Sequence, residues 1–411
     1  MEGIFSPYHH GNLHLRNRII KSAVYEGRCD RNGFPSESYL DYYKTLAMND
    51  VGGIITGFAY ISKVGRAMHP FQAGIDHPEK IKYYRNVTDA VHDHHCPIYL
   101  QIAHAGRQTL RRATGTALKG CSTKRSIYFR EKPEILRTEE VYRIITEFSD
   151  AAFYAREAGF DGIQLHAAHG YLIHQFLLPA INDRKDEFGI DENTGIGSAF
   201  LEKVIAAVRE KCGKNFPVLV KISGAVDIKP EFSTRHFEEL IKFLNRMPVD
   251  AIEISYGTMD HALNIFRGDV PESLILSQNP IFGTGNPVKR AVSKAIMQQY
   301  FIRKLKPFTP VYNLAFAATA KKLTGIPIIS VGGFRKGSEI RDAISSGKAD
   351  LAGLARPFIC EPDFINKLKI NGFHESQCTN CNICSVMCDS SHETRCYKTK
   401  PEDYGTHQQN S

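Results

Sequence analysis

The chain has 411 residues, with 52 Lys and Arg against 44 Asp and Glu, and its formal net charge is +8. The basic residues are scattered among acidic ones, a distribution that does not favour a nucleic-acid partner. No run of about 18 apolar residues occurs, so no membrane-spanning segment is expected, and the first residues lack the pattern of a secretory signal. We therefore expect a cytoplasmic protein.

Eight apolar or β-branched segments alternate with helix-like segments along the chain. The predicted strands cover residues 18–24, 52–56, 97–103, 160–165, 217–222, 250–255, 326–331 and 350–354. The predicted helices cover residues 36–48, 79–93, 138–158, 198–212, 234–245, 312–323, 336–346 and 362–370. Strands that alternate with helices pair in parallel through right-handed crossovers. Eight such units predict an α/β fold, a (β/α)8 TIM barrel, with an open doubly wound sheet as the alternative.

Two predicted connections are unusually long, one over residues 104–137 and one over residues 256–310. Both follow the carboxyl end of a strand, where barrel enzymes carry their active sites. We expect these insertions to cover or shape the site, although surface loops without a role are the alternative. Residues 288–306 are locally basic and predict a solvated helix face, or else a surface that attracts a phosphorylated co-substrate or a partner.

His166, His169 and Tyr171 lie close together at the end of the predicted strand 160–165. Imidazoles can donate hydrogen bonds to an oxygen that gains negative charge, and a tyrosine hydroxyl can serve as a general acid. The alternative is that all three are core or loop residues without a catalytic role. The pattern predicts a site that holds a carbonyl oxygen and delivers a proton beside it.

Glycines and an arginine follow the last two predicted strands, as Gly332-Gly333 and Arg356. Barrel enzymes often bind phosphate there, because glycines let backbone amides approach and an arginine adds a bidentate cation. Gln101 and Lys221 lie in the third and fifth predicted strands and would place an amide and a cation toward the same end. That pair suits a flavin ring, whose reduced form is stabilised by positive charge near N1, although a structural lysine is the alternative.

Further motifs follow in a fixed order, namely NRIIKSA at 17–23, QIAHAGRQ at 101–108, HAAHGY at 166–171 and NDRKDEFG at 182–189. Together with the glycine and Arg-Pro elements, they resemble the old yellow enzyme family of FMN-dependent NAD(P)H:flavin oxidoreductases. The resemblance covers about residues 3–370.

The resemblance also implies roles for single residues. The groups implied to bind FMN are Ser22, Ala23, Val24, Tyr25, Phe58, Gln101, Lys221, Gly332, Gly333 and Arg356. The residues implied to be catalytic are Tyr171 as the proton donor, with His166 and His169 on the substrate oxygen. Tyr25 departs from the family, which often carries a threonine, cysteine or histidine at this position that tunes the flavin.

The segment from residue 372 to 411 changes in composition, and five of the ten cysteines crowd into it. The predicted metal ligands are Cys378, Cys381, Cys384 and Cys396. Their spacing predicts a [4Fe-4S] cluster, with zinc or an empty relic as the alternatives. It resembles the cluster segment of dienoyl-CoA reductases and trimethylamine dehydrogenase. We thus expect a barrel over residues 1–371 and a cysteine-rich metal-binding tail over residues 372–411 with a disordered end.

These observations favour an FMN enzyme that takes hydride from NADH or NADPH and reduces activated alkenes such as α,β-unsaturated carbonyl compounds. The alternative is a flavin dehydrogenase or demethylase that oxidises an amine or alcohol and passes electrons through the iron–sulfur cluster to an external carrier. A third hypothesis, a flavin-bearing redox sensor, does not explain a proton donor. The expected partners are a small-molecule substrate and NADH or NADPH, with an electron carrier and a second copy of the chain as further candidates.

Overall fold

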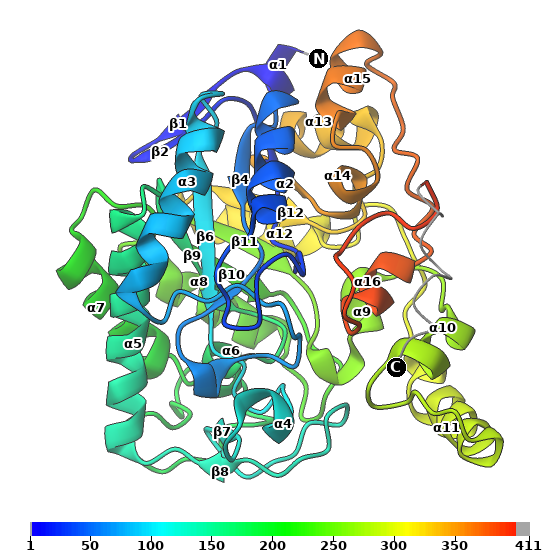
Figure 1. Ribbon diagram of the computed structural model, residues 1–411. Helices are drawn as coiled ribbons and strands as arrows, with labels where there is room; N and C mark the ends of the chain where they lie inside the picture. The colour runs from blue at the N-terminus through cyan, green and yellow to red at the C-terminus, as the bar shows by residue number, and fades with distance from the viewer. Residues whose placement is uncertain (1, 400–411) are drawn as a thin grey trace.

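Eight parallel strands form the wall of a closed barrel in the computed structural model, which describes residues 2–399 (Figure 1). They are β3 Ile19–Lys21, β4 Gly53–Ile55, β6 Ile98–Ala103, β9 Gly162–Ala167, β10 Val218–Ser223, β11 Ala251–Ser255, β12 Ile328–Val331 and β13 Leu351–Leu354. Pairing of β3 with β13 and of β4 with β6 closes the ring. All eight predicted strands are confirmed, and the first is shorter than expected.

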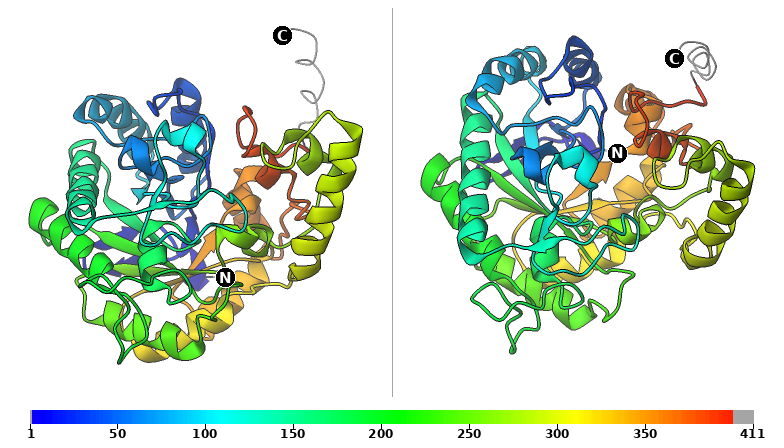
Figure 2. Two further views of the ribbon diagram at one scale, coloured as in Figure 1. Left: turned by 90° about the horizontal axis from the view of Figure 1, so that it is seen from below. Right: turned by 60° about the horizontal axis from the view of Figure 1, so that its bottom comes forward.

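The predicted helices are also confirmed, and they surround the strands (Figure 2). They are α2 Glu37–Met48, α3 Ile81–His92, α5 Thr138–Glu157, α7 Ala199–Cys212, α8 Thr234–Asn245, α12 Leu314–Leu323, α13 Gly337–Ser345 and α15 Phe364–Ile370. Helix α8 shows why they form. Ser233 caps its first turn by accepting from the amide of His236, and Phe237, Leu240 and Leu244 recur at helical spacing on the buried face.

The two-residue period of the strands sorts the barrel interior into layers. Tyr99, Leu219 and Ala251 point inward at one level and pack with Leu13 and Leu15. These two leucines come from the hairpin of β1 Tyr8–His10 and β2 Leu13–Leu15, which closes the amino-terminal end of the barrel. Two residues further along the strands, the inward-facing side chains are polar. The apolar layer of Tyr99, Leu219 and Ala251 therefore supports a polar layer at the carboxyl end of the barrel.

Both long connections lie at this carboxyl end, as predicted (Figure 1). The first insertion, residues 104–137, contains α4 Arg111–Thr114, β7 Lys119–Gly120 and β8 Glu134–Ile135. The second, residues 256–310, contains α9 Leu263–Phe266, α10 Glu272–Gln278 and α11 Pro287–Tyr300. Shorter elements are α1 Glu2–Phe5, β5 Ala59–Tyr60, α6 Leu172–Leu177, α14 Arg356–Cys360 and α16 Ile383–Met387.

The tail returns to the barrel and packs beside the second insertion, where α16 lies next to α10 (Figures 1 and 2). The amide of Gln377 donates to the Glu361 carboxylate at 2.8 Å, and the amide of Thr394 donates to the Glu26 carbonyl at 2.7 Å. The described part of the tail is thus fixed to both ends of the barrel sequence. The predicted disordered end falls mainly on residues 400–411, which lie outside the described residues.

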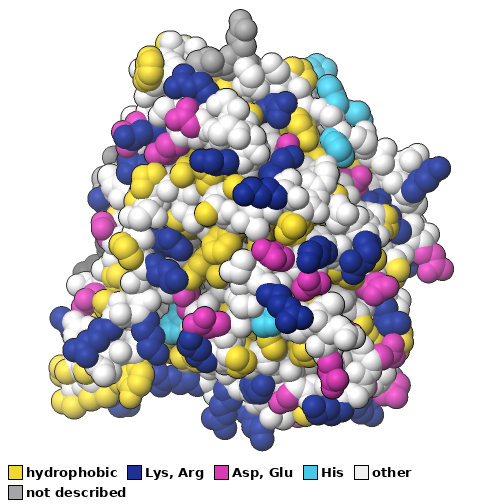
Figure 3. All heavy atoms as spheres, turned by 180° about the vertical axis from the view of Figure 1, so that it is seen from behind, with side chains coloured by type: hydrophobic (Ala, Val, Ile, Leu, Met, Phe, Trp, Pro, Cys, Tyr) yellow, Lys and Arg dark blue, Asp and Glu magenta, His cyan; other side chains and the backbone are white. Residues whose placement is uncertain are grey.

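Lys and Arg side chains are dispersed among acidic ones on the face in Figure 3, and apolar side chains gather beside basic ones where α11 lies. Helix α11, Pro287–Tyr300, forms the first part of the basic segment noted in the sequence, and its Val288 is 72% exposed. None of the helices formed by residues 2–399 has both the length and the apolar character that crossing a bilayer requires.

Candidate active site

A large cavity lies at the carboxyl ends of the strands, bordered by both insertions and the tail. The predicted site residues that line it are Ala23, Val24, Tyr25, Phe58, Gln101, His166, His169, Tyr171, Lys221, Gly332, Gly333 and Arg356. Ser22 is fully buried and does not line the cavity. The sequence therefore identified residues from seven strands or strand ends that the fold brings together.

A chain of hydrogen bonds crosses the floor of the cavity. Gln101 Nε2 donates to Gln164 Oε1 at 2.7 Å, and Gln164 Nε2 donates to Glu253 Oε2 at 2.7 Å. The same Glu253 oxygen lies 3.5 Å from Lys221 Nζ. Strand register explains this chain, because Gln101 pairs with Gln164, and Lys221 pairs with Glu253. The buried carboxylate thereby holds the amide and the ammonium of the floor in place.

The two histidines and the tyrosine meet at the end of β9. The ring centroid of His166 lies 4.9 Å from that of His169 and 4.7 Å from that of Tyr171. His169 adopts a φ of +61°, a left-handed conformation uncommon for residues other than glycine, and this turn brings its ring back beside His166. Burial lowers the pKa of both histidines well below the usual value, so both rings are neutral.

Hydrogen bonds restrict the tautomers of these rings. The Ala168 amide donates to Nδ1 of His166 at 3.4 Å, which assigns the proton of that ring to Nε2. Nε2 of His169 lies 2.8 Å from the Ser255 hydroxyl, at the end of β11. Ser255 also lines the cavity, and no sequence motif pointed to it.

Tyr171 occupies the turn that precedes α6 and is 4% exposed. Its ring lies 5.3 Å from that of Phe58, which comes from the loop after β4. The carbonyl oxygen of Phe58 accepts from Gln72 Nε2 at 3.1 Å. Burial raises the pKa of Tyr171, and the nearby Asp389 and Cys388 raise it further, so its hydroxyl keeps its proton at neutral pH.

The far end of the cavity carries the glycine pair and Arg356. Gly332 and Gly333 adopt φ values of +128° and +88°, a conformation in which any other residue would be strained. A β-carbon at Gly332 would lie 2.5 Å from the Tyr312 ring, and one at Gly333 would lie 2.5 Å from the Val311 amide nitrogen. Arg356 Nη1 donates to Asn382 Oδ1 in the tail at 2.8 Å. This end of the cavity is therefore lined by glycine backbone and a guanidinium, which are groups that bind phosphate.

Comparison with known proteins agrees with this geometry. A family model described as the NADH:flavin oxidoreductase / NADH oxidase family matches residues 3–269. The chain belongs to this family. The predicted resemblance to the old yellow enzyme group is thereby confirmed, as is the barrel fold that the family shares.

Single relatives support the same assignment. The chain is 27% identical over 382 residues to an NADH oxidase of Thermoanaerobacter brockii, across 92% of this chain and 53% of that protein. It is 26% identical over 384 residues to a 4,4'-dithiodibutanoate disulfide reductase of Rhodococcus erythropolis, across 93% of this chain and 92% of that protein. The chain spans about half the length of the NADH oxidase.

Among solved structures, the old yellow enzyme homologue from Zymomonas mobilis superposes with a TM-score of 0.70 at 22% identity, covering 92% of this chain and 96% of that chain. This similarity concerns the fold.

The cavity fits the flavin of the NADH:flavin oxidoreductase family. Tyr25 lines the cavity, and its buried hydroxyl oxygen has no hydrogen-bond partner within residues 2–399. Buried polar atoms are normally paired, so such atoms indicate groups that a bound molecule would satisfy. The cation of Lys221 at the floor and the glycine pair at the far end match the two halves of FMN, its ring and its phosphate.

The fold brings the predicted cavity residues together, but it does not bring the four predicted metal ligands together in a metal site. Within residues 2–399, no three His, Cys, Asp or Glu side chains are arranged to hold a metal ion. Cys396 instead meets Cys360, at the end of α14, and the hydrogen bond from that thiol lowers the pKa of Cys396 to about 5. Sequence spacing gave no signal for Cys360. The structure lends no support to the predicted iron–sulfur or zinc site.

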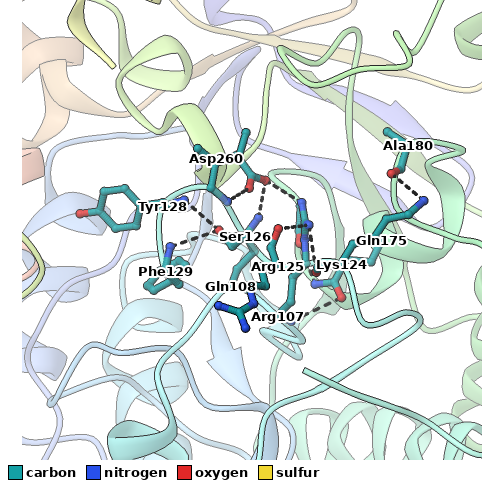
Figure 4. Close-up of polar contacts among 12 residues, drawn as sticks. Arg107, Gln108, Lys124, Arg125, Ser126, Tyr128, Phe129, Gln175, Ala180 and Asp260 are labelled. Atoms are coloured by element: carbon teal, nitrogen blue, oxygen red, sulfur yellow. Dashed lines mark hydrogen bonds and ion pairs between the residues drawn. The ribbon is translucent and has the colours of Figure 1, made fainter. Parts of the chain in front are cut away.

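A buried polar network joins the two insertions (Figure 4). Asp260 Oδ2 accepts from Arg107 Nη2 at 2.9 Å and from Gln108 Nε2 at 2.8 Å. Its Oδ1 accepts from the Ile127 amide at 2.7 Å. This network fixes the loop that carries Tyr128, whose side chain lines the cavity.

Proposed function

We propose that this protein is an FMN-dependent NAD(P)H oxidoreductase of the ene-reductase type, which reduces activated alkenes such as α,β-unsaturated carbonyl compounds. The observation that carries the proposal is the convergence of two neutral imidazoles and a buried phenol, His166, His169 and Tyr171, in one cavity. NADH or NADPH and the small-molecule substrate would occupy this cavity in turn, which gives ping-pong kinetics.

Two groups of residues would hold FMN. Gln101 and Lys221 would contact its ring at the floor, and Gly332, Gly333 and Arg356 would hold its phosphate at the far end. When bound, FMN accepts a hydride from NAD(P)H and supplies it to the alkene.

The imidazoles would orient and polarise the substrate carbonyl. Nε2 of His166 carries a hydrogen that can be donated to the carbonyl oxygen, because Nδ1 of this ring already accepts from the Ala168 amide. His169 can donate through Nδ1 when the Ser255 hydroxyl donates to its Nε2. Two donors on one oxygen stabilise the negative charge that develops there in the transition state.

Tyr171 would deliver the proton to the carbon next to the carbonyl group. Its raised pKa keeps the hydroxyl protonated until that carbon gains negative charge. With 4% of Tyr171 exposed, bulk water has little access as a competing proton donor.

The alternative is an amine or alcohol dehydrogenase that passes electrons through a cluster to an external carrier, and residues 2–399 form no group of ligands for such a cluster. The test is an anaerobic titration of the purified protein with NADH or NADPH and then with cyclohexenone, with iron analysis of the same sample. We expect the flavin absorbance to bleach and then to recover. A colourless protein, or a flavin that neither nucleotide bleaches, would refute the proposal, and about four iron atoms per chain would favour the alternative.

A further inference from the structure

Asp389 brings a carboxylate from the tail into the cavity. Its side chain is 12% exposed, and it lines the cavity. Oδ2 accepts from Asn279 Nδ2 at 2.6 Å and from the Tyr128 hydroxyl at 3.3 Å. Between residues 2 and 399, Oδ1 accepts no hydrogen bond, and its ion-pair contact is Nδ1 of His69 at 3.7 Å. One oxygen is therefore fixed by the second insertion and the loop of Tyr128, and the other is available to a ligand.

His69 does not neutralise this carboxylate. Burial lowers the pKa of His69 to about 4, and its Nδ1 hydrogen is donated to the Cys388 carbonyl at 2.9 Å. In the part of the chain that the structure describes, no Lys or Arg nitrogen lies within 4.0 Å of the Asp389 oxygens. A buried carboxylate without a counter-charge is costly, and burial accordingly raises the pKa of Asp389 to about 7. A cation placed in the cavity would remove this cost.

The side chains of His69 and Tyr128 contact the carboxylate from two sides, and each packs against a further aromatic ring. On the barrel side, Tyr25 stacks on His69 with ring centroids 4.4 Å apart. On the insertion side, the ring of Tyr128 lies 5.9 Å from that of Phe282. All four rings line the cavity. Faces of aromatic rings attract organic cations, and a carboxylate between them adds charge complementarity.

We propose that Asp389, with the rings of Tyr25 and Tyr128, forms a subsite for an organic ammonium group, so that the substrate of this enzyme carries a protonated or quaternary amine. Lysine-like primary amines and fully substituted ammonium groups share this chemistry. The assignment of the cation to the substrate rests on the proposed reductase, since the subsite lies in the cavity that contains Tyr171. The cation would fix the substrate at its charged end while His166 and His169 hold the carbonyl end.

The experiment compares two ligands of the same shape and different charge. Choline and its uncharged carbon analogue, 3,3-dimethylbutan-1-ol, are titrated into the oxidised holoenzyme at about pH 8, and binding is followed by calorimetry. We expect choline to bind at least about tenfold more tightly, and Asp389→Asn to reduce this preference below about threefold.

Asp227→Asn is the matched control. The Asp227 carboxylate also accepts from a tyrosine hydroxyl and an asparagine amide, of Tyr256 and Asn264, but it does not line the cavity. This variant should keep the preference for choline. Equal binding of the two ligands by the unaltered protein would overturn the proposal even if Asp389→Asn failed to fold, and so would equal weakening of both ligands by that variant.

The outcome is separable from that of the reductase proposal. An enzyme that reduces cyclohexenone but shows no preference for choline would refute the ammonium subsite alone. A protein that prefers choline through Asp389 but is neither bleached by a nucleotide nor recoloured by the enone would support the subsite and refute the reductase.

Discussion

Replacing Tyr171 with phenylalanine tests the proposed proton donor with a minimal change. The ring of Tyr171 packs against Phe58 and His166, at centroid distances of 5.3 and 4.7 Å, and phenylalanine preserves these contacts. Only the hydroxyl is lost. We therefore expect reduction of the flavin by NAD(P)H to change little, because that half-reaction takes no proton from this group.

The expected effect on the alkene half-reaction follows from the surroundings of the hydroxyl. A positioned general acid contributes roughly 100-fold to 10,000-fold. At 4% exposure, water is a poor substitute for it, which argues for a large effect, whereas the acid Asp389 in the same cavity can offset part of the loss. We expect a decrease of about 100-fold, equivalent to about 2.7 kcal/mol in the activation free energy.

The measurement is stopped-flow absorbance of the flavin in separate reductive and oxidative half-reactions. Tyr256→Phe is the control, since it removes a buried hydroxyl near the end of β11 that does not line the cavity. Equal slowing of both half-reactions by Tyr171→Phe, or a loss below about threefold in the oxidative one, would refute the role of Tyr171 as general acid.

Three other predictions concern the groups around the cavity. Ser255→Ala should slow enone reduction at least about tenfold, because His169 then loses the contact that selects its donating tautomer. The affinity for choline should rise about tenfold between about pH 6 and about pH 8, since the pKa of Asp389 is about 7 and the cation binds only the ionised carboxylate. Asp260→Ala should lower the free energy of unfolding in urea by about 3–5 kcal/mol, because it leaves the buried guanidinium of Arg107 without its partner.

Each of these has an outcome that would contradict it. Unchanged oxidative rates in Ser255→Ala would mean that His169 does not donate to the substrate. A choline affinity independent of pH would place the cation elsewhere, since His69, with a pKa of about 4, stays neutral over this range. A stability loss below about 1 kcal/mol for Asp260→Ala would show that the network joining the insertions is dispensable.

The sequence alone predicted the barrel and twelve of the residues that line its cavity. Alternating apolar segments and helical periodicity are local properties, so the eight strands could be located without coordinates. The site residues Gln101, His166 and Lys221 follow from the strands that carry them, because inward-facing positions at the carboxyl ends of parallel strands meet at one end of a barrel. Cysteine spacing, in contrast, predicted a metal site that the described residues do not form.

The tertiary structure decided which remote segments meet above that barrel end. One hydrogen-bonded group contains Tyr128, Asn279 and Asp389. Each of these residues is more than a hundred positions from the next in the sequence. They lie in three irregular segments and share no motif. Cys360, in α14, and Cys396, in the tail, likewise meet without any spacing motif that pairs them. Such contacts depend on the path that the insertions and the tail take over the barrel, and that path is set by packing between distant parts of the chain, which leaves no periodic signal in the sequence.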